Sequence, residues 1–318
     1  MNKKTKDIIG CISFMVGLLI LFTVLSVIFV PKDNSRAAGM EAVQANGILG
    51  EKENTIDYII LGDSETHSSF TPMQIWKDYG YTGYVCGTNA QHLYESEKFL
   101  RQALKHQSPK YVILETNAIY RYSSIENAIM AKAENYFPLF RYHDRWKNLK
   151  FSDLGGSVQY TYTNYSKGYR FEDRIDGVEN KEYMKPTERT KHITKINRHY
   201  VNNIINLCKE NHIELILVST PSISNWTYAK HNGIQKLADQ NGLTYIDMNL
   251  MQDQLEIDWE TDTRDKGDHL NYSGAVKVTD WLGTYFKQCG EFTDHRQDAA
   301  YQSWNKDLKR YEKKVSGK

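Results

Sequence analysis

Cysteine is scarce in this sequence, and its positions exclude two kinds of architecture. The 318 residues include four cysteines: Cys11 lies within an apolar run, and Cys86, Cys208 and Cys289 lie beyond it. An odd and sparse set does not make a disulfide framework. The chain also lacks a Cys-x-x-Cys or histidine-rich spacing, so we expect neither a metal nor another cofactor. Cys86 and Cys208 have apolar neighbours and are predicted to be buried.

An excess of charge of one sign is also absent. Lys and Arg together number 40, Asp and Glu together number 39, and the net charge is +1. A protein that grips nucleic acid through its phosphates needs a basic surface, and this composition supplies none. We therefore expect no nucleic-acid partner.

One long apolar run lies near the N-terminus. Ile8–Val30 contains no charged residue and follows Lys3, Lys4 and Lys6. A helix rises about 1.5 Å per residue, so the run can cross a hydrocarbon core of about 30 Å. The apolar region of a cleaved signal peptide is only about 7–15 residues long. We therefore predict a single-span signal anchor over 1–30, with cleavage near "SRAAGMEA" as the alternative. The lysines predict a cytoplasmic N-terminus and an extracellular remainder at the cell membrane.

The remainder is long enough to bury a full core. Polar residues 31–55 are predicted to be a tether. Residues 56–288 form the predicted folded domain, with an irregular tyrosine-rich insertion over about 118–186. Residues 289–318 are polar, and we expect a surface helix or a disordered tail.

Apolar runs and helical periodicity alternate within the predicted domain. Strands are predicted at 56–61, 84–86, 111–115, 213–220 and 243–248. Helices are predicted at 72–79, about 93–104, 193–208, a segment ending at Asn241, and about 274–287. Near-continuous apolar strands separated by helices indicate an α/β fold, with a parallel sheet covered on both faces.

Three residues follow directly on predicted strands. Ser64 comes after "IDYIILGD", Gly87 after "YVC", and Asn117 after "YVILET". In parallel sheets, functional sites form outside the carboxyl ends of the strands. A serine there becomes a nucleophile when a base and an oxyanion-stabilising group join it.

His269 is the candidate base. It lies in the non-periodic loop "DTRDKGDHLNYSGA", which leads into the last predicted helix. Asp265 and Asp268 lie in the same loop, and either carboxylate can orient an imidazole and stabilise its charged form.

Together these segments resemble the sequence blocks of the SGNH, or GDSL-like, hydrolase superfamily. Gly62-Asp63-Ser64 resembles the first block, and the stretch ending at His269-Leu270-Asn271 resembles the last. Gly87 matches the second-block glycine, and Asn117 matches the asparagine of the third. The resemblance implies a three-layer, flavodoxin-like parallel sheet.

The resemblance also implies residue roles. Ser64 would be the nucleophile and His269 the base. The oxyanion hole would consist of the N–H groups of Ser64 and Gly87 with the Asn117 side chain.

The chain departs from the family pattern in two blocks. In the third block, Glu115 and Ala118 stand where the family has glycine and aspartate. In the last block, Lys266 stands where the family's aspartate precedes the histidine by three residues. Asp265 and Asp268 therefore both remain candidates for the third member of a Ser–His–Asp site, with Asp265 slightly preferred.

Other polar and aromatic residues near these blocks receive weaker predictions. His67 is expected to be a loop residue and a poor base. Glu65 is either a ligand for a hydroxyl or amine or an exposed acid in a turn. Trp226, after a strand end, is a candidate wall of the pocket.

The apolar anchor, the short tether and "DHLN" followed by "GA" resemble the anchored DltD-like members of the superfamily. This implies an acyltransferase, esterase or deacetylase acting on cell-envelope glycopolymers such as teichoic acid or surface polysaccharide. An acyl carrier and a membrane-bound O-acyltransferase are the expected partners. The alternative is a non-catalytic subunit that keeps the fold and assembles with such an acyltransferase.

Overall fold

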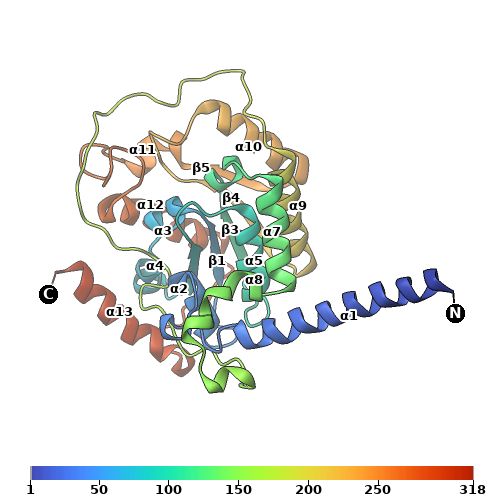
Figure 1. Ribbon diagram of the computed structural model, residues 1–318. Coiled ribbons are helices and arrows are strands. Elements are labelled where there is room, and N and C mark those ends of the chain that lie inside the picture. The colour runs from blue at the N-terminus through green and yellow to red at the C-terminus, as the bar shows by residue number, and fades with distance from the viewer. Residues whose placement is uncertain (1, 318) are drawn as a thin grey trace. The chain divides into compact units, whose positions relative to one another are not determined.

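A computed structural model describes residues 2–317 of the chain (Figure 1). Met1 and Lys318, the ends of the predicted anchor and tail, lie outside the described residues. The chain divides into two compact units. The anchor unit comprises Met1–Val43 and Ser124–Tyr162, and the sheet unit comprises Gln44–Ser123 and Thr163–Lys318.

The sheet unit contains one sheet of five parallel strands in the order β2-β1-β3-β4-β5. This is the flavodoxin-like order, in which the chain reverses direction beside β1 and leaves a crevice at the strands' carboxyl ends. The fold-class prediction is confirmed. The strands are β1 Tyr58–Gly62, β2 Gly83–Gly87, β3 Tyr111–Glu115, β4 Glu214–Ser219 and β5 Thr244–Asp247.

Helices cover the sheet on both faces, because side chains of each strand alternate between them. Tyr58 and Ile60 of β1 join a buried core with α4 (Pro72–Tyr79) and α12 (Tyr272–Cys289). On the other face, α5 (Leu93–Ala103) packs against β1 and against α9 (Lys195–Glu210). Within the sheet unit, Figure 1 shows α12, α3 and α4 on one side and α5 and α9 on the other. The remaining elements of this unit are α3 Ser64–Ser69, α6 Asn117–Tyr120, α10 Tyr228–Asn241, α11 Gln252–Leu255, α13 Gln302–Val315, and the 3₁₀ turns Gly47–Gly50, Met248–Leu250 and Ala299–Tyr301.

The predicted tether and tail take a larger part in the sheet unit than their polarity suggested. Ile48 and Leu49, in the second half of the predicted tether, are buried. In α13, Trp304 and Tyr311 are buried: Trp304 packs against Trp76, and the Tyr311 hydroxyl accepts a hydrogen bond from Thr71 Oγ1 at 2.7 Å. The prediction of buried Cys86 and Cys208 is confirmed.

The anchor unit is built around α1 (Lys3–Phe29), which is long and apolar enough to cross a membrane. Its other helices are α7 Ile125–Tyr136, α8 Leu139–Tyr142 and the 3₁₀ turns Arg36–Ala38, His143–Asn148 and Phe151–Leu154; the short helix α2, Val43–Asn46, joins the two units in sequence. The 12-residue α7 corrects the prediction of an irregular insertion over this part of the chain. Arg145 donates to the Phe29 carbonyl and pairs with Asp153, which places a cation at the carboxyl end of α1.

Candidate active site

The turn between β1 and α3 presents Ser64 at the carboxyl edge of the sheet. Gly62 is required there, since a Cβ on it would lie 2.2 Å from Thr66 Oγ1 and 2.7 Å from Glu115 Cβ. Asp63 caps α3 by accepting from the Glu65 N–H at 3.1 Å. The Arg121 guanidinium holds the other Asp63 oxygen at 2.7 Å. The sharp exit from the strand is thereby fixed, and Ser64 is the first residue of the helix.

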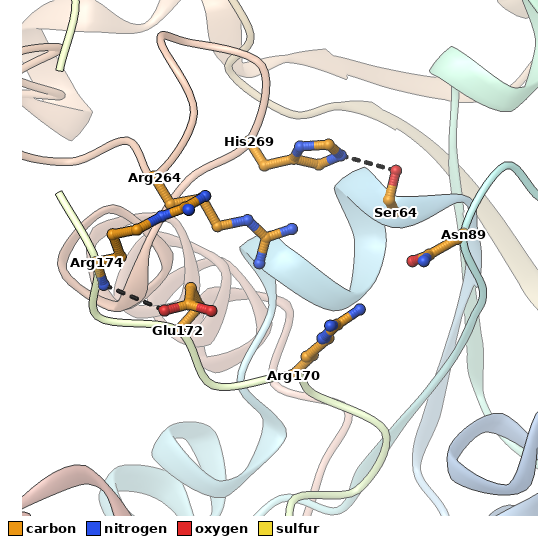
Figure 2. Close-up of a pocket in the computed structure, with 7 residues that line it drawn as sticks. All are labelled: Ser64, Asn89, Arg170, Glu172, Arg174, Arg264 and His269. Atoms are coloured by element: carbon orange, nitrogen blue, oxygen red, sulfur yellow. Dashed lines mark hydrogen bonds between the residues drawn. The ribbon is translucent and has the colours of Figure 1, made fainter. Parts of the chain in front are cut away.

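The structure brings Ser64, His269 and Asp265 into one hydrogen-bonded chain. Ser64 Oγ lies 2.7 Å from His269 Nε2, and His269 Nδ1 lies 2.7 Å from Asp265 Oδ2. Figure 2 shows the imidazole pointing at the serine hydroxyl from the loop before α12. This order of contacts lets a serine pass its proton to a histidine whose far nitrogen is held by a carboxylate.

Asp265 lies closer to His269 than Asp268 does. Asp268 Oδ2 is 3.5 Å from His269 Nδ1, and the other Asp268 oxygen accepts from the Asn225 amide. Lys266 and Gly267 adopt left-handed backbone conformations, with φ of 60° and 85°, and turn the loop back on itself. As a result, Asp265 Oδ1 also accepts from the His269 N–H at 2.6 Å. Burial opposes ionisation of Asp265, but these bonds to His269 outweigh it and lower the Asp265 pKa.

Two buried glutamates lie behind the serine. Glu65 is 1 % exposed, which excludes the exposed turn acid among the expectations. Burial, and then the charge of Asp63, raises the pKa of both Glu65 and Glu115 well above the usual range. Glu65, Asp268 and His269 bring ligand atoms within 4.8 Å of one another. Both His269 nitrogens already have partners, however, so a metal there would have to displace Ser64 or Asp265.

Of the predicted oxyanion residues, Gly87 lies beside the turn that carries Ser64, whereas the Asn117 side chain is bonded to other residues. Gly87 ends β2 beside Gly62, where a Cβ would meet the Asp63 carbonyl at 3.2 Å. The Asn117 amide is occupied: Nδ2 donates to Asp63 Oδ2 at 3.2 Å, and Oδ1 accepts from Lys230 Nζ at 3.2 Å. Asn117 therefore supports the Asp63 turn, and it is not among the residues that line the pocket at Ser64.

Asn89 lies in that pocket, two residues beyond Gly87. His67, which was expected in a loop, is buried in α3, and its Nε2 is 3.0 Å from Asn89 Oδ1. Burial lowers the His67 pKa to about 4, so the ring is neutral near pH 7 and donates its proton to this oxygen. With its oxygen held in this way, Asn89 keeps its amide N–H groups for the pocket.

The pocket has a volume of about 240 Å³ and opens beside Ser64 and His269. Its other lining residues are Asn89, Arg170, Glu172, Arg174 and Arg264, none of which the sequence predicted. Trp226 does not line it; its indole is buried and donates to Asp247 at 3.0 Å. The sequence could have indicated Arg264, because it directly precedes Asp265 in the loop that carries the candidate base. Arg170 and Arg174 lie in the predicted insertion, where no motif marked them.

Comparison with known proteins adds little to this geometry. No family model matches the chain, and no curated protein matches it. Among solved structures, a candidate acylhydrolase from Bacteroides fragilis is 15% identical, with 77% of this chain and 92% of that chain covered and a TM-score of 0.38. A GDSL-like lipase from Bacteroides thetaiotaomicron is 16% identical, with 73% and 86% covered and a TM-score of 0.35. Likeness at this level carries no argument about the chemistry of the site.

Proposed function

We propose that the protein is a membrane-anchored serine acyl-transfer enzyme that acts on ester bonds of cell-envelope glycopolymers. The observation that carries the proposal is the continuous chain from Ser64 Oγ through His269 to Asp265, with 2.7 Å at each step. Its position at the carboxyl end of β1 agrees with where parallel sheets place their sites.

The proposed reaction has two halves. Ser64 Oγ attacks the acyl carbonyl while His269 Nε2 takes its proton, and Asp265 stabilises the imidazolium. The tetrahedral intermediate collapses when His269 returns the proton to the leaving oxygen or sulfur, which leaves the acyl group on Ser64. Water or a sugar hydroxyl then attacks this ester by the reverse sequence, which makes the enzyme an esterase or an O-acyltransferase.

The negative charge of the intermediate needs donors next to Ser64. The Ser64 N–H is one, because the first N–H groups of a helix have no partner within the helix. The Gly87 N–H is the second. We assign the third to the Asn89 amide, which lies in the pocket, in place of Asn117, whose amide is bound to Asp63 and Lys230. Such a donor contributes about 10²- to 10³-fold in rate.

The anchor points to the substrate. With α1 in the membrane, the site would act at the envelope, where esters occur on teichoic acids and acylated surface polysaccharides. A membrane-bound O-acyltransferase would be a suitable source of acyl groups, delivered as an ester or thioester.

Fluorophosphonate labelling of the full chain in detergent tests this proposal. Ser64→Ala and His269→Ala should lose both labelling and hydrolysis of a small acetyl ester, because each removes one end of the proton-transfer pair. The exposed Ser108 provides a matched control, and Ser108→Ala should label as the wild type does. A folded wild-type protein that neither labels nor turns over ester, even with a membrane-bound acyltransferase present, would favour the non-catalytic assembly subunit.

A further inference from the structure

The pocket beside Ser64 carries more positive than negative charge. Three arginines line it, Arg170, Arg174 and Arg264, with Glu172 as the carboxylate among its lining residues. Arg264 is partly committed, since it donates to Ser68 Oγ at 2.8 Å and lies 3.7 Å from Asp265 Oδ2. Among residues 2–317, no carboxylate lies within 4.0 Å of the guanidinium of Arg170 or Arg174. The Arg174 backbone N–H donates to Glu172 Oε1 at 3.4 Å, but neither the Arg170 nor the Arg174 guanidinium has an ion-pair partner among the described residues.

The backbone that carries Arg170 and Arg174 is held in place by the fold, and both residues are exposed. The Arg170 N–H donates to the His67 carbonyl at 2.9 Å, and the Glu172 carbonyl accepts from Tyr272 N–H at 2.7 Å. A few residues earlier, the buried Lys167 bonds to Glu51 at 2.8 Å and Asp307 at 2.9 Å. Figure 2 shows Arg170 and Arg264 approaching the space beside Ser64 from different loops.

We infer that the substrate carries an anionic oxygen group, a phosphate or a carboxylate, close to the ester that Ser64 attacks. Guanidinium groups bind such groups through paired N–H bonds, and a pocket with more arginines than carboxylates next to the nucleophile favours anionic esters over neutral ones. This inference deepens the proposed function and rests on it. The anion lies either on the acyl group or on the alcohol that carries it.

Paired small esters separate these two sources. In the first pair, mono-4-nitrophenyl succinate is compared with the neutral 4-nitrophenyl acetate, and the charge lies on the acyl group. In the second pair, acetylated glycerol 1-phosphate is compared with the neutral acetylglycerol, and the charge lies on the alcohol. We expect one anionic member to be preferred, and its kcat/KM ratio over the neutral ester to fall about 10-fold in Arg170→Gln and in Arg174→Gln. The exposed Arg189, outside the pocket, is the matched control, and Arg189→Gln should keep the wild-type ratio.

A binding measurement separates failure of this inference from failure of the proposed chemistry. In full-length Ser64→Ala, calorimetry should detect glycerol 1-phosphate or succinate, and Arg170→Gln should weaken that binding about 10-fold. Equal turnover of anionic and neutral esters, or equal ratios in all three arginine variants, would overturn the anion site. If the protein binds the anion through Arg170 but is not labelled by fluorophosphonate, the anion-binding site is supported and the proposed acyl-transfer activity is wrong.

A second observation, independent of the active site, concerns the anchor unit. Segment Ser124–Tyr162 contacts α1 well inside its apolar run, where Phe22 packs against Phe137 at 5.6 Å and Phe140 at 5.4 Å between ring centroids. Phe22 precedes Val30, the end of that run, by about 12 Å at 1.5 Å per residue. If α1 spans a core of about 30 Å, the turn at Phe137–Phe140 lies below the membrane surface.

The same segment exposes apolar side chains that a soluble surface would not gather. Ile125, Ile129 and Tyr136 of α7 are 64%, 64% and 72% exposed, and Phe151 is 90% exposed. Its buried charge is paired, since Arg145 contacts Asp153 at 3.0 Å. We propose that 125–158 lies in the outer leaflet as an interfacial segment, with these side chains in lipid. Because this segment packs against Phe22, inside the apolar run of α1, we infer that lipid and not a protein partner covers it.

Fluorescent labelling of the full chain in lipid nanodiscs tests this placement. In a Cys11→Ser, Cys289→Ser background, bimane at Ile129→Cys or Phe151→Cys should be quenched by brominated acyl chains and protected from aqueous iodide. Bimane at Ile175→Cys, on the sheet unit, is the control and should show the reverse. In nanodiscs without another protein, equal iodide quenching of bimane at positions 129, 151 and 175 would overturn the proposal. That result is expected if a protein partner, and not lipid, covers this surface.

Discussion

Replacing Asp265 by asparagine is expected to lower kcat about 10³- to 10⁴-fold. The carboxylate accepts a hydrogen bond from His269 Nδ1–H at 2.7 Å, which leaves Nε2 without a hydrogen and free to receive the Ser64 proton. An asparagine amide can present an N–H to Nδ1 and stabilise the opposite tautomer, in which Nε2 carries a hydrogen and cannot act as a base. The loss also removes the charge that stabilises the imidazolium.

Asp268→Asn is the matched control for this prediction, since the two aspartates lie in one loop. Its contact to Nδ1 is 3.5 Å and it is more exposed, so we expect a loss of about fivefold or less. The measurement is the single-turnover rate on an activated ester, with thermal unfolding showing that both variants fold. A larger loss in Asp268→Asn than in Asp265→Asn would reverse the assignment made from the distances.

The sequence predicted those parts of the site that follow from strand ends. Ser64 and Gly87 lie at the carboxyl ends of neighbouring strands because each leaves its strand through a glycine-containing turn. The choice between Asp265 and Asp268 could not be made from spacing. It depends on the left-handed backbone at Lys266 and Gly267, which shortens the path back to His269.

The residues that the sequence missed depend on contacts between distant parts of the chain. Asn89 faces the pocket because His67, buried beneath it, holds its oxygen. Arg170 faces the pocket because its loop is tied to His67 and because Lys167 reaches buried carboxylates far away in sequence. Local periodicity cannot report such contacts, and the segment therefore looked irregular.

Lys167→Met is expected to lower the free energy of unfolding by about 3–5 kcal/mol, a large share of the 5–15 kcal/mol typical of a folded domain. The Lys167 side chain is fully buried, between Glu51 at 2.8 Å and Asp307 at 2.9 Å, with Trp304 4.3 Å from its ammonium group. Burial already raises the Glu51 pKa, although the charge of Lys167 opposes that rise. Without the cation, the buried Glu51 carboxylate has no ion-pair partner, and Asp307 keeps only the exposed Arg310, whose Nη1 lies 3.5 Å from its Oδ1.

Neutralising the carboxylates separates loss of charge from loss of packing. Adding Glu51→Gln and Asp307→Asn to Lys167→Met should restore most of the lost stability in urea unfolding, and the exposed Lys185→Met should change it little. Equal stability of Lys167→Met and the wild type would contradict the role given to the ion pair. Lys167 also holds the segment that carries Arg170. At a temperature where Lys167→Met remains folded, we therefore expect this variant to lose the preference for anionic esters. The triple variant should regain that preference along with its stability, since the arginines themselves are untouched.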